Sequence, residues 1–176
     1  MSEAAADTIG KLRGSTIITE IKKAGVSHIL SVPDLHTSKG LLHPIAADGD
    51  FRHIRVCKED ECLGIVAGLT YGDIRSLMLV QYTGFLYAMN AIRGVAIEQK
   101  LPICMMIGLL GKEPGVPPTE SKRYGLRIIE PILDVLGVTR TCIETDEDTP
   151  RISAAINEAW RSSRPTAILI GGRPEA

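Results

Sequence analysis

Hydrophobic residues occur along this chain in two alternating patterns. Short continuous runs of Val, Ile, Leu and Met are typical of strands that are buried on both faces of a sheet. Longer stretches carry apolar residues three or four positions apart, which is typical of helices with one buried face. The first pattern predicts strands over residues 28–33, 54–57, 77–82, 102–107, 138–143 and 166–170. The second predicts helices over 5–24 (one helix or a pair), 35–47, 59–71, 85–99, 126–136 and 150–162.

Turn-forming residues lie between these segments. Gly25 predicts the end of the first helix, Pro44 a break in the second, and residues 48–50 (Asp-Gly-Asp) a turn. Residues 108–124 are rich in glycine, proline and charge, and they predict one long functional or mobile loop. The last residues, 173–176, are expected to form a frayed tail.

The regular alternation of buried strands and helices predicts the fold class. Strands of this kind, separated by helices, indicate a three-layer α/β/α domain with a mainly parallel sheet of about six strands. With 176 residues, the chain is expected to form one domain over its whole length, 1–176. Ligands of such domains bind beyond the carboxyl ends of the strands, so polar residues at these ends are candidates for chemistry.

Composition narrows the class of protein. A net charge of −1 and a hydrophobic content of 44% are typical of an ordinary soluble protein and give no sign of nucleic-acid binding. The longest apolar run, 101–110, is much shorter than the roughly 20 residues that cross a membrane. We therefore expect a cytoplasmic protein without a membrane partner. The four cysteines form no CxxC pair and show no ligand spacing with the histidines, so they are interpreted as reduced, and no metal site is expected in this chain.

Three acids follow the second predicted strand and begin the next helix: Glu59, Asp60 and Glu61. Carboxylates in a first turn interact favourably with the helix dipole, and any of the three can be present for that reason alone. We interpret Asp60 and Glu61 in this way, as solvated first-turn acids. Glu59 stands apart because of its distance from a later Ala-Gly pair.

Several motifs carry a family resemblance over nearly the whole chain. Glu59 precedes Ala67-Gly68 at the spacing of the catalytic glutamate motif in the pyrimidine-binding domain of thiamine diphosphate enzymes. Four further segments resemble that domain in the same order: Ser31-Val32-Pro33-Asp34, Gln81-Tyr82-Thr83-Gly84 with the later Asn90, 101–108 and 132–137. Within this family the chain most resembles the sulfopyruvate decarboxylase alpha subunit and the N-terminal domain of phosphonopyruvate decarboxylase.

The resemblance implies a role for Glu59. In the family, a glutamate carboxylate binds N1′ of the cofactor's aminopyrimidine and favours its imino tautomer, while the cofactor carries the electron sink. It also implies cofactor contacts at Pro33, Asp34, Gln81, Tyr82 and Thr83. Ordinary packing at the end of a strand is the alternative for Tyr82 and Thr83, which replace the asparagine and serine usual in the family.

Three residues are candidates for substrate contact. Gln81 ends the third strand, and His36 follows the Pro33-Asp34 turn, where a surface or helix-start histidine is the alternative. Lys112 lies in the 108–124 loop and is a candidate for recognising a sulfonate or phosphonate, because such anions are met by fixed positive charge. The alternative for Lys112 is a solvated, charged lid. An apolar or aromatic substituent on the substrate also stays open.

A missing motif indicates a partner. Thiamine diphosphate enzymes hold the diphosphate through Mg²⁺ on a Gly-Asp-Gly segment of a second domain, and that segment does not occur here. We therefore expect a beta subunit that supplies the diphosphate and Mg²⁺ site, together with self-association of this chain. The expected activity is decarboxylation of a 2-oxo acid to an aldehyde and carbon dioxide. A carboligase or 2-oxo acid oxidoreductase subunit, or a nonenzymatic scaffold or regulatory partner, is the alternative.

Overall fold

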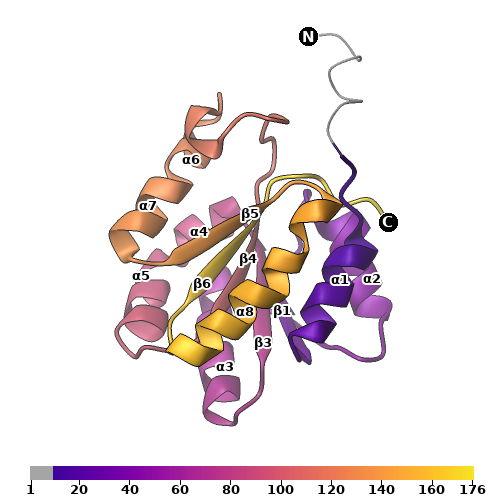
Figure 1. Ribbon diagram of the computed structural model, residues 1–176. Coiled ribbons are helices and arrows are strands. Elements are labelled where there is room, and N and C mark those ends of the chain that lie inside the picture. The colour runs from indigo at the N-terminus through magenta and orange to yellow at the C-terminus, as the bar shows by residue number, and fades with distance from the viewer. Residues whose placement is uncertain (1–9) are drawn as a thin grey trace.

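The computed structural model describes residues 10–176 and is built around a six-stranded sheet (Figure 1). Every pairing between neighbouring strands is parallel, which confirms the predicted α/β class. The strands are β1 (His28–Ser31), β2 (Arg52–Arg55), β3 (Ser76–Gln81), β4 (Cys104–Gly108), β5 (Thr139–Ile143) and β6 (Thr166–Ile170), in the spatial order β2-β1-β3-β4-β6-β5.

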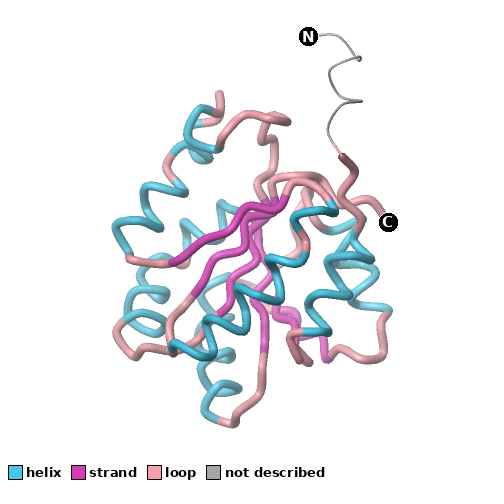
Figure 2. Tube along the Cα trace, viewed as in Figure 1, coloured by secondary structure: helices cyan, strands magenta, loops and turns pink. Residues whose placement is uncertain are grey.

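Helices cover both faces of the sheet (Figures 1 and 2). One face carries α1 (Gly14–Lys23), the π-helix η2 (Ser38–Leu42), α2 (His43–Ala47) and α8 (Pro150–Ser162). The other carries α3 (Glu59–Tyr71), α4 (Tyr82–Tyr87), α5 (Met89–Ala91), the π-helix η3 (Ile92–Ile97), α6 (Tyr124–Arg127) and α7 (Ile129–Leu136). Two short 3-10 turns, η4 (Pro118–Glu120) and η5 (Asp146–Asp148), lie in the connections.

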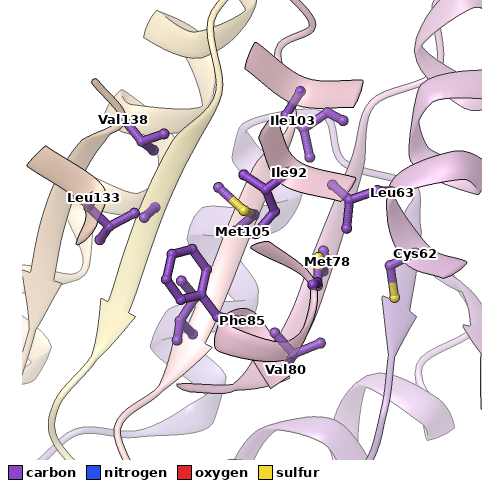
Figure 3. Packing of buried hydrophobic residues seen from close by; sticks show 14 of the residues in the cluster. Cys62, Leu63, Met78, Val80, Phe85, Ile92, Ile103, Met105, Leu133 and Val138 are labelled. Atoms are coloured by element: carbon purple, nitrogen blue, oxygen red, sulfur yellow. The ribbon is translucent and has the colours of Figure 1, made fainter. Parts of the chain in front are cut away.

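Side chains of the central strands alternate between two hydrophobic cores. Met78 and Met105 face the α3 and α4 side, where they pack around Phe85 (Figure 3). Leu77 and Met106, their neighbours in sequence, face the α1 and α8 side. This alternation follows from the two-residue period of a strand, and it explains why the central strands are apolar at every position.

The order of the strands creates a site at the carboxyl edge of the sheet. From β1 the chain crosses to β2 on one side and then returns to place β3 on the other side of β1. The connections that leave β1 and β3 therefore diverge, and a crevice forms between them, as is general for doubly wound sheets. β3 also extends past the end of β1, because Ser31 pairs with Leu79 and Gln81 lies beyond that pair.

Several sequence predictions of local structure are corrected. The predicted 35–47 helix begins later, at Ser38, and it divides next to Pro44 as predicted, where η2 gives way to α2 and Pro44 lies in the first turn, where no N–H is needed. The predicted 85–99 helix begins earlier, at Tyr82. The prediction of a frayed tail is wrong, because the backbone N–H of Glu175 donates to Leu12 and its carbonyl accepts from Gly14, each bond 2.8 Å long. The part of the first predicted helix before residue 10 lies outside the described residues.

No helix within residues 10–176 is both long enough and apolar enough to cross a membrane.

Candidate active site

Glu59 is the first residue of α3 and is half-buried at the carboxyl edge of the sheet. The turn that delivers it from β2 is held by Glu61, whose carboxylate accepts the backbone N–H groups of Cys57 (3.0 Å) and Lys58 (3.4 Å). Glu61 is exposed in the first turn of α3, as predicted, and it also caps the helix. This cap fixes the direction in which α3 begins, and with it the position of Glu59.

The Glu59 side chain lies directly against the backbone of Gly84 in α4. A Cβ on Gly84 would lie 2.4 Å from both Cγ and Oε1 of Glu59, so this position accommodates only glycine while the carboxylate stays in place. Among the described residues no donor hydrogen-bonds to the Glu59 carboxylate. Its charge acts on its surroundings, since burial first, and then the Glu59 carboxylate, raise the pKa of Cys62 to about 12.

Asp60, unlike Glu61, differs from its sequence interpretation. Its Oδ1 atom is buried and has no hydrogen-bond partner among the described residues, so Asp60 is not a freely solvated acid. A buried acceptor without a donor costs about 1–3 kcal/mol. Within residues 10–176, neither the Glu59 carboxylate nor the buried oxygen of Asp60 has a hydrogen-bond donor. Because the Asp60 oxygen is buried, a ligand that brings its own N–H group would meet the Glu59 carboxylate.

Gln81, Tyr82 and Thr83 lie at the junction between β3 and α4. The Gln81 side chain is half-buried, and its Nε2 donates a hydrogen bond of 2.9 Å to Oγ1 of Thr83. Tyr82 turns away toward α6, where its ring lies on the backbone of Gly125 so closely that a Cβ there would be 2.7 Å from Cε2. Ordinary packing at the end of a strand, the alternative to a cofactor contact, therefore accounts for the position of the Tyr82 ring. Gln81 lies at the carboxyl edge of the sheet.

Asp34 is buried and organises the turn after β1. Its carboxylate accepts hydrogen bonds from the backbone N–H groups of His36 and Thr37 and from the Thr37 hydroxyl. These bonds occupy both of its oxygens, so Asp34 shapes the edge of the crevice through the conformation of the turn.

His36 points toward the end of β6, and the alternative of a surface histidine is wrong, since only 6% of the residue is exposed. Its Nε2 lies 3.0 Å from the carbonyl oxygen of Ile170 and 3.1 Å from that of Gly172. Both partners are acceptors, so Nε2 carries the proton. Burial lowers the pKa of His36, and the neutral ring is the stable form at neutral pH.

Lys112 is buried, which contradicts the alternative of a solvated lid for this residue. Its side chain is 1% exposed, and Nζ forms an ion pair of 2.7 Å with Oε1 of Glu144, just beyond β5. The 108–124 loop is also bonded internally. The Glu113 carboxylate accepts the Ser121 hydroxyl (2.7 Å) and the Lys122 N–H (3.1 Å), and these bonds lower its pKa. These contacts bond part of the 108–124 loop to itself and to the end of β5.

Two cavities open at the carboxyl edge of the sheet. The first has a volume of about 370 Å³ and is lined by Pro33, Asp34, Leu35, Ser38, Lys39, Gln81 and Arg173. The second, of about 740 Å³, includes His36, Lys112, Glu144 and again Arg173 in its lining.

The predicted site residues divide into three groups by their position relative to these cavities. Pro33, Asp34 and Gln81 share the first cavity, His36 and Lys112 share the second, and Glu59, Tyr82 and Thr83 lie on α3 and α4 outside both.

Sequence reasoning missed Arg173, which lines both cavities. A signal was present, because Arg173 closely follows the last strand, at the edge where ligands bind. Within residues 10–176 no three His, Cys, Asp or Glu side chains are grouped so that they could hold a metal ion.

The fold is that of a solved 2-oxoglutarate:ferredoxin oxidoreductase from Magnetococcus marinus, with a TM-score of 0.71 and 15% identity over 91% of this chain and 28% of the other. No family model matches the sequence.

Among curated proteins, the chain is similar to the sulfopyruvate decarboxylase subunit alpha of Methanocaldococcus jannaschii, with 28% identity over 90% of this chain and 93% of that protein. It is 27% identical to the same subunit of Methanothermobacter thermautotrophicus, over 85% of this chain and 90% of that protein. A sulfopyruvate decarboxylase of Methanosarcina acetivorans is 27% identical over 88% of this chain, which spans only 38% of that longer protein. These relatives confirm the resemblance to sulfopyruvate decarboxylase that the motifs indicate.

Proposed function

We propose that this chain, as a single domain over 1–176, is the pyrimidine-binding alpha subunit of a thiamine diphosphate dependent 2-oxo acid decarboxylase. The proposal rests on the position of the Glu59 carboxylate. Its half-buried carboxylate lies against Gly84 at the carboxyl edge of a parallel sheet and lacks a donor from the described chain. It occupies the position that the family motif assigns to the catalytic glutamate. The relatives named sulfopyruvate decarboxylase support a carboxy-lyase.

Thiamine diphosphate, when bound, supplies the carbon nucleophile and the electron sink for the loss of carbon dioxide. The residues of this chain hold and orient it. Glu59 accepts a hydrogen bond from the pyrimidine ring nitrogen and thereby sets the protonation state of the ring. Gln81, fixed by Thr83, offers an amide to the reacting carboxylate, while Pro33 and Asp34 shape the wall of the crevice. A closed site with little water favours loss of the charged carboxylate.

The diphosphate and Mg²⁺ are assigned to a beta subunit. Magnesium needs several oxygen ligands in near-octahedral geometry, and the Gly-Asp-Gly segment that provides them in the family is not part of this sequence. The designation of two relatives as subunit alpha supports a hetero-oligomer. Half-exposed apolar side chains on α3 and α5, Ile65 and Met89, are consistent with assembly and with self-association of the chain. We place the assembled enzyme in the cytoplasm.

A second function on the same cofactor is oxidation of a 2-oxo acid. The fold of the Magnetococcus oxidoreductase favours it, but at 15% identity that likeness concerns the fold alone. The alpha subunit relatives match almost over their full length, and they favour decarboxylation. Carboligation on the same cofactor and a scaffold role remain alternatives to be tested against the enzyme.

The test is product analysis with the assembled complex. The chain is coexpressed with a neighbouring chain that bears the Gly-Asp-Gly segment, and the complex is supplied with thiamine diphosphate, Mg²⁺ and a panel of 2-oxo acids. We expect one mole of aldehyde for each mole of carbon dioxide, only when both chains are present. Carbon dioxide formed together with a reduced acceptor would indicate the oxidoreductase. Equal activity of the partner alone would indicate a scaffold or regulatory role.

A further inference from the structure

The carboxyl-terminal tail is held in place by close backbone packing. A Cβ on Gly40, within η2, would lie 1.9 Å from the carbonyl oxygen of Pro174, so the tail and η2 are in direct backbone contact. The hydrogen bonds of Glu175 with Leu12 and Gly14 hold the tail from its other side. The backbone at Arg173, one residue before Pro174, is therefore held at the carboxyl edge of the sheet, while its side chain is exposed.

The same contact brings Lys39 close to Arg173. Lys39 immediately precedes Gly40 as Arg173 immediately precedes Pro174, and both side chains line the 370 Å³ cavity that also contains Gln81. Lys39 lies in the π-helix η2, a rare geometry that is frequent at functional sites. Two cations that lie far apart in the sequence thus line one small cavity.

The charges of this cavity are not balanced. Its lining contains a single acid, Asp34, whose carboxylate already accepts three hydrogen bonds within its own turn. Within residues 10–176, neither Lys39 nor Arg173 forms an ion pair. The second cavity differs, because Lys112 there is paired with Glu144. The first cavity therefore presents two exposed cations, free of ion pairs within the described residues, beside the Gln81 amide.

We infer that Lys39 and Arg173 bind a second anionic group on the substrate, and that they select 2-oxo acids that carry a sulfonate or phosphonate. The inference rests on the proposed function and names residues that set its specificity. A guanidinium and an ammonium together provide charge-assisted donors for the oxygens of such a group. The cavity volume of about 370 Å³ suits a small ligand. The Gln81 amide then lies next to the reacting end of the bound molecule.

Kinetics of the assembled complex test the inference. For sulfopyruvate, Lys39→Gln or Arg173→Gln is expected to raise KM about tenfold each, and the double variant about 100-fold, since each change removes one charge-assisted contact. The value of kcat stays within about threefold of wild type, because neither residue contacts the reacting atoms. KM for pyruvate, which lacks the second anion, stays the same. Arg164→Gln is the control, an exposed arginine that precedes the amino end of β6. Equal losses with both substrates, or no loss with either, would overturn the inference.

A binding measurement without cofactor separates this inference from the proposed function. Sulfoacetate and acetate are titrated at constant ionic strength into the full chain labelled with ¹⁵N. Sulfoacetate is expected to shift the Arg173 Nε and Gln81 side-chain signals more than acetate does, and the double variant is expected to lose this difference. If these shifts occur while no 2-oxo acid is turned over by the complex, the proposed function fails and the cation pair stands. If turnover occurs without any sulfoacetate-specific shift, the inference fails and the function stands.

Discussion

Glu59→Gln is expected to lower turnover of the assembled complex by about 10²- to 10⁴-fold, the range typical of a positioned acid or base. Glutamine retains the shape of the side chain but not the negative charge that sets the protonation of the pyrimidine ring. The carboxylate accepts no hydrogen bond from the described chain, and glutamine can keep its packing against Gly84, so the change removes no native hydrogen bond. The free energy of unfolding should therefore change by no more than about 0.5 kcal/mol. Turnover and thermal unfolding of the same preparation check both expectations.

Glu61→Gln is the matched control for this variant. Glu61 lies in the same turn of α3, but its carboxylate is used to accept the Cys57 and Lys58 N–H groups. The amide oxygen of glutamine can still accept these bonds, so activity should stay near wild type while stability falls by up to about 1 kcal/mol. Full activity of the Glu59→Gln complex, or an equal loss of activity in the control, would remove Glu59 from its catalytic assignment.

Gly84→Ala should reduce activity without preventing folding. The new methyl group would lie 2.4 Å from Oε1 of Glu59, and the flexible carboxylate is the group that can move away. A displacement of about 1 Å in a catalytic group can cost about 100-fold in rate. In a helix, alanine is about 0.5–1 kcal/mol better than glycine, which offsets part of the strain. We therefore expect a folded complex whose turnover is about 100-fold lower.

Two comparisons make the Gly84 prediction specific. Gly94, in the neighbouring π-helix η3, has open space at its Cβ position, so Gly94→Ala should retain full activity. The double variant Glu59→Gln with Gly84→Ala should be no worse than Glu59→Gln alone, since both changes remove the same carboxylate from its position. Additive losses in the double variant would mean that Gly84 acts on the site by a route other than Glu59.

Where a local signal marks an element, the sequence predicted it to the residue. The helix Glu59–Tyr71 begins with three acids that favour a helix start, and Pro150 marks the first turn of the helix Pro150–Ser162. The strand Thr166–Ile170 was also predicted with its correct bounds, because it is a continuous apolar run that follows Pro165. The motif spacing singled out Glu59 among the three acids, and its catalytic role stays a prediction.

The features that sequence reasoning missed depend on contacts between residues that are distant in the sequence. The tail looked frayed because nothing in residues 173–176 announces that Pro174 packs on Gly40 from the other end of the chain. Arg173 was overlooked for the same reason. Lys112 looked solvated because its partner, Glu144, follows a different strand. The buried oxygen of Asp60 depends on packing around the first turn of α3, which the pattern of charges cannot reveal.

The central claim is that this chain holds one half of a thiamine diphosphate site. Calorimetric titration of thiamine diphosphate with Mg²⁺, into the chain alone and into the chain coexpressed with its neighbouring subunit, tests it most directly. Tight binding in the mixture, with none to the isolated chain, is the predicted result, and the Glu59→Gln complex should bind the cofactor more weakly. Absence of binding in the mixture would contradict the account, and so would equally tight binding to the partner subunit alone.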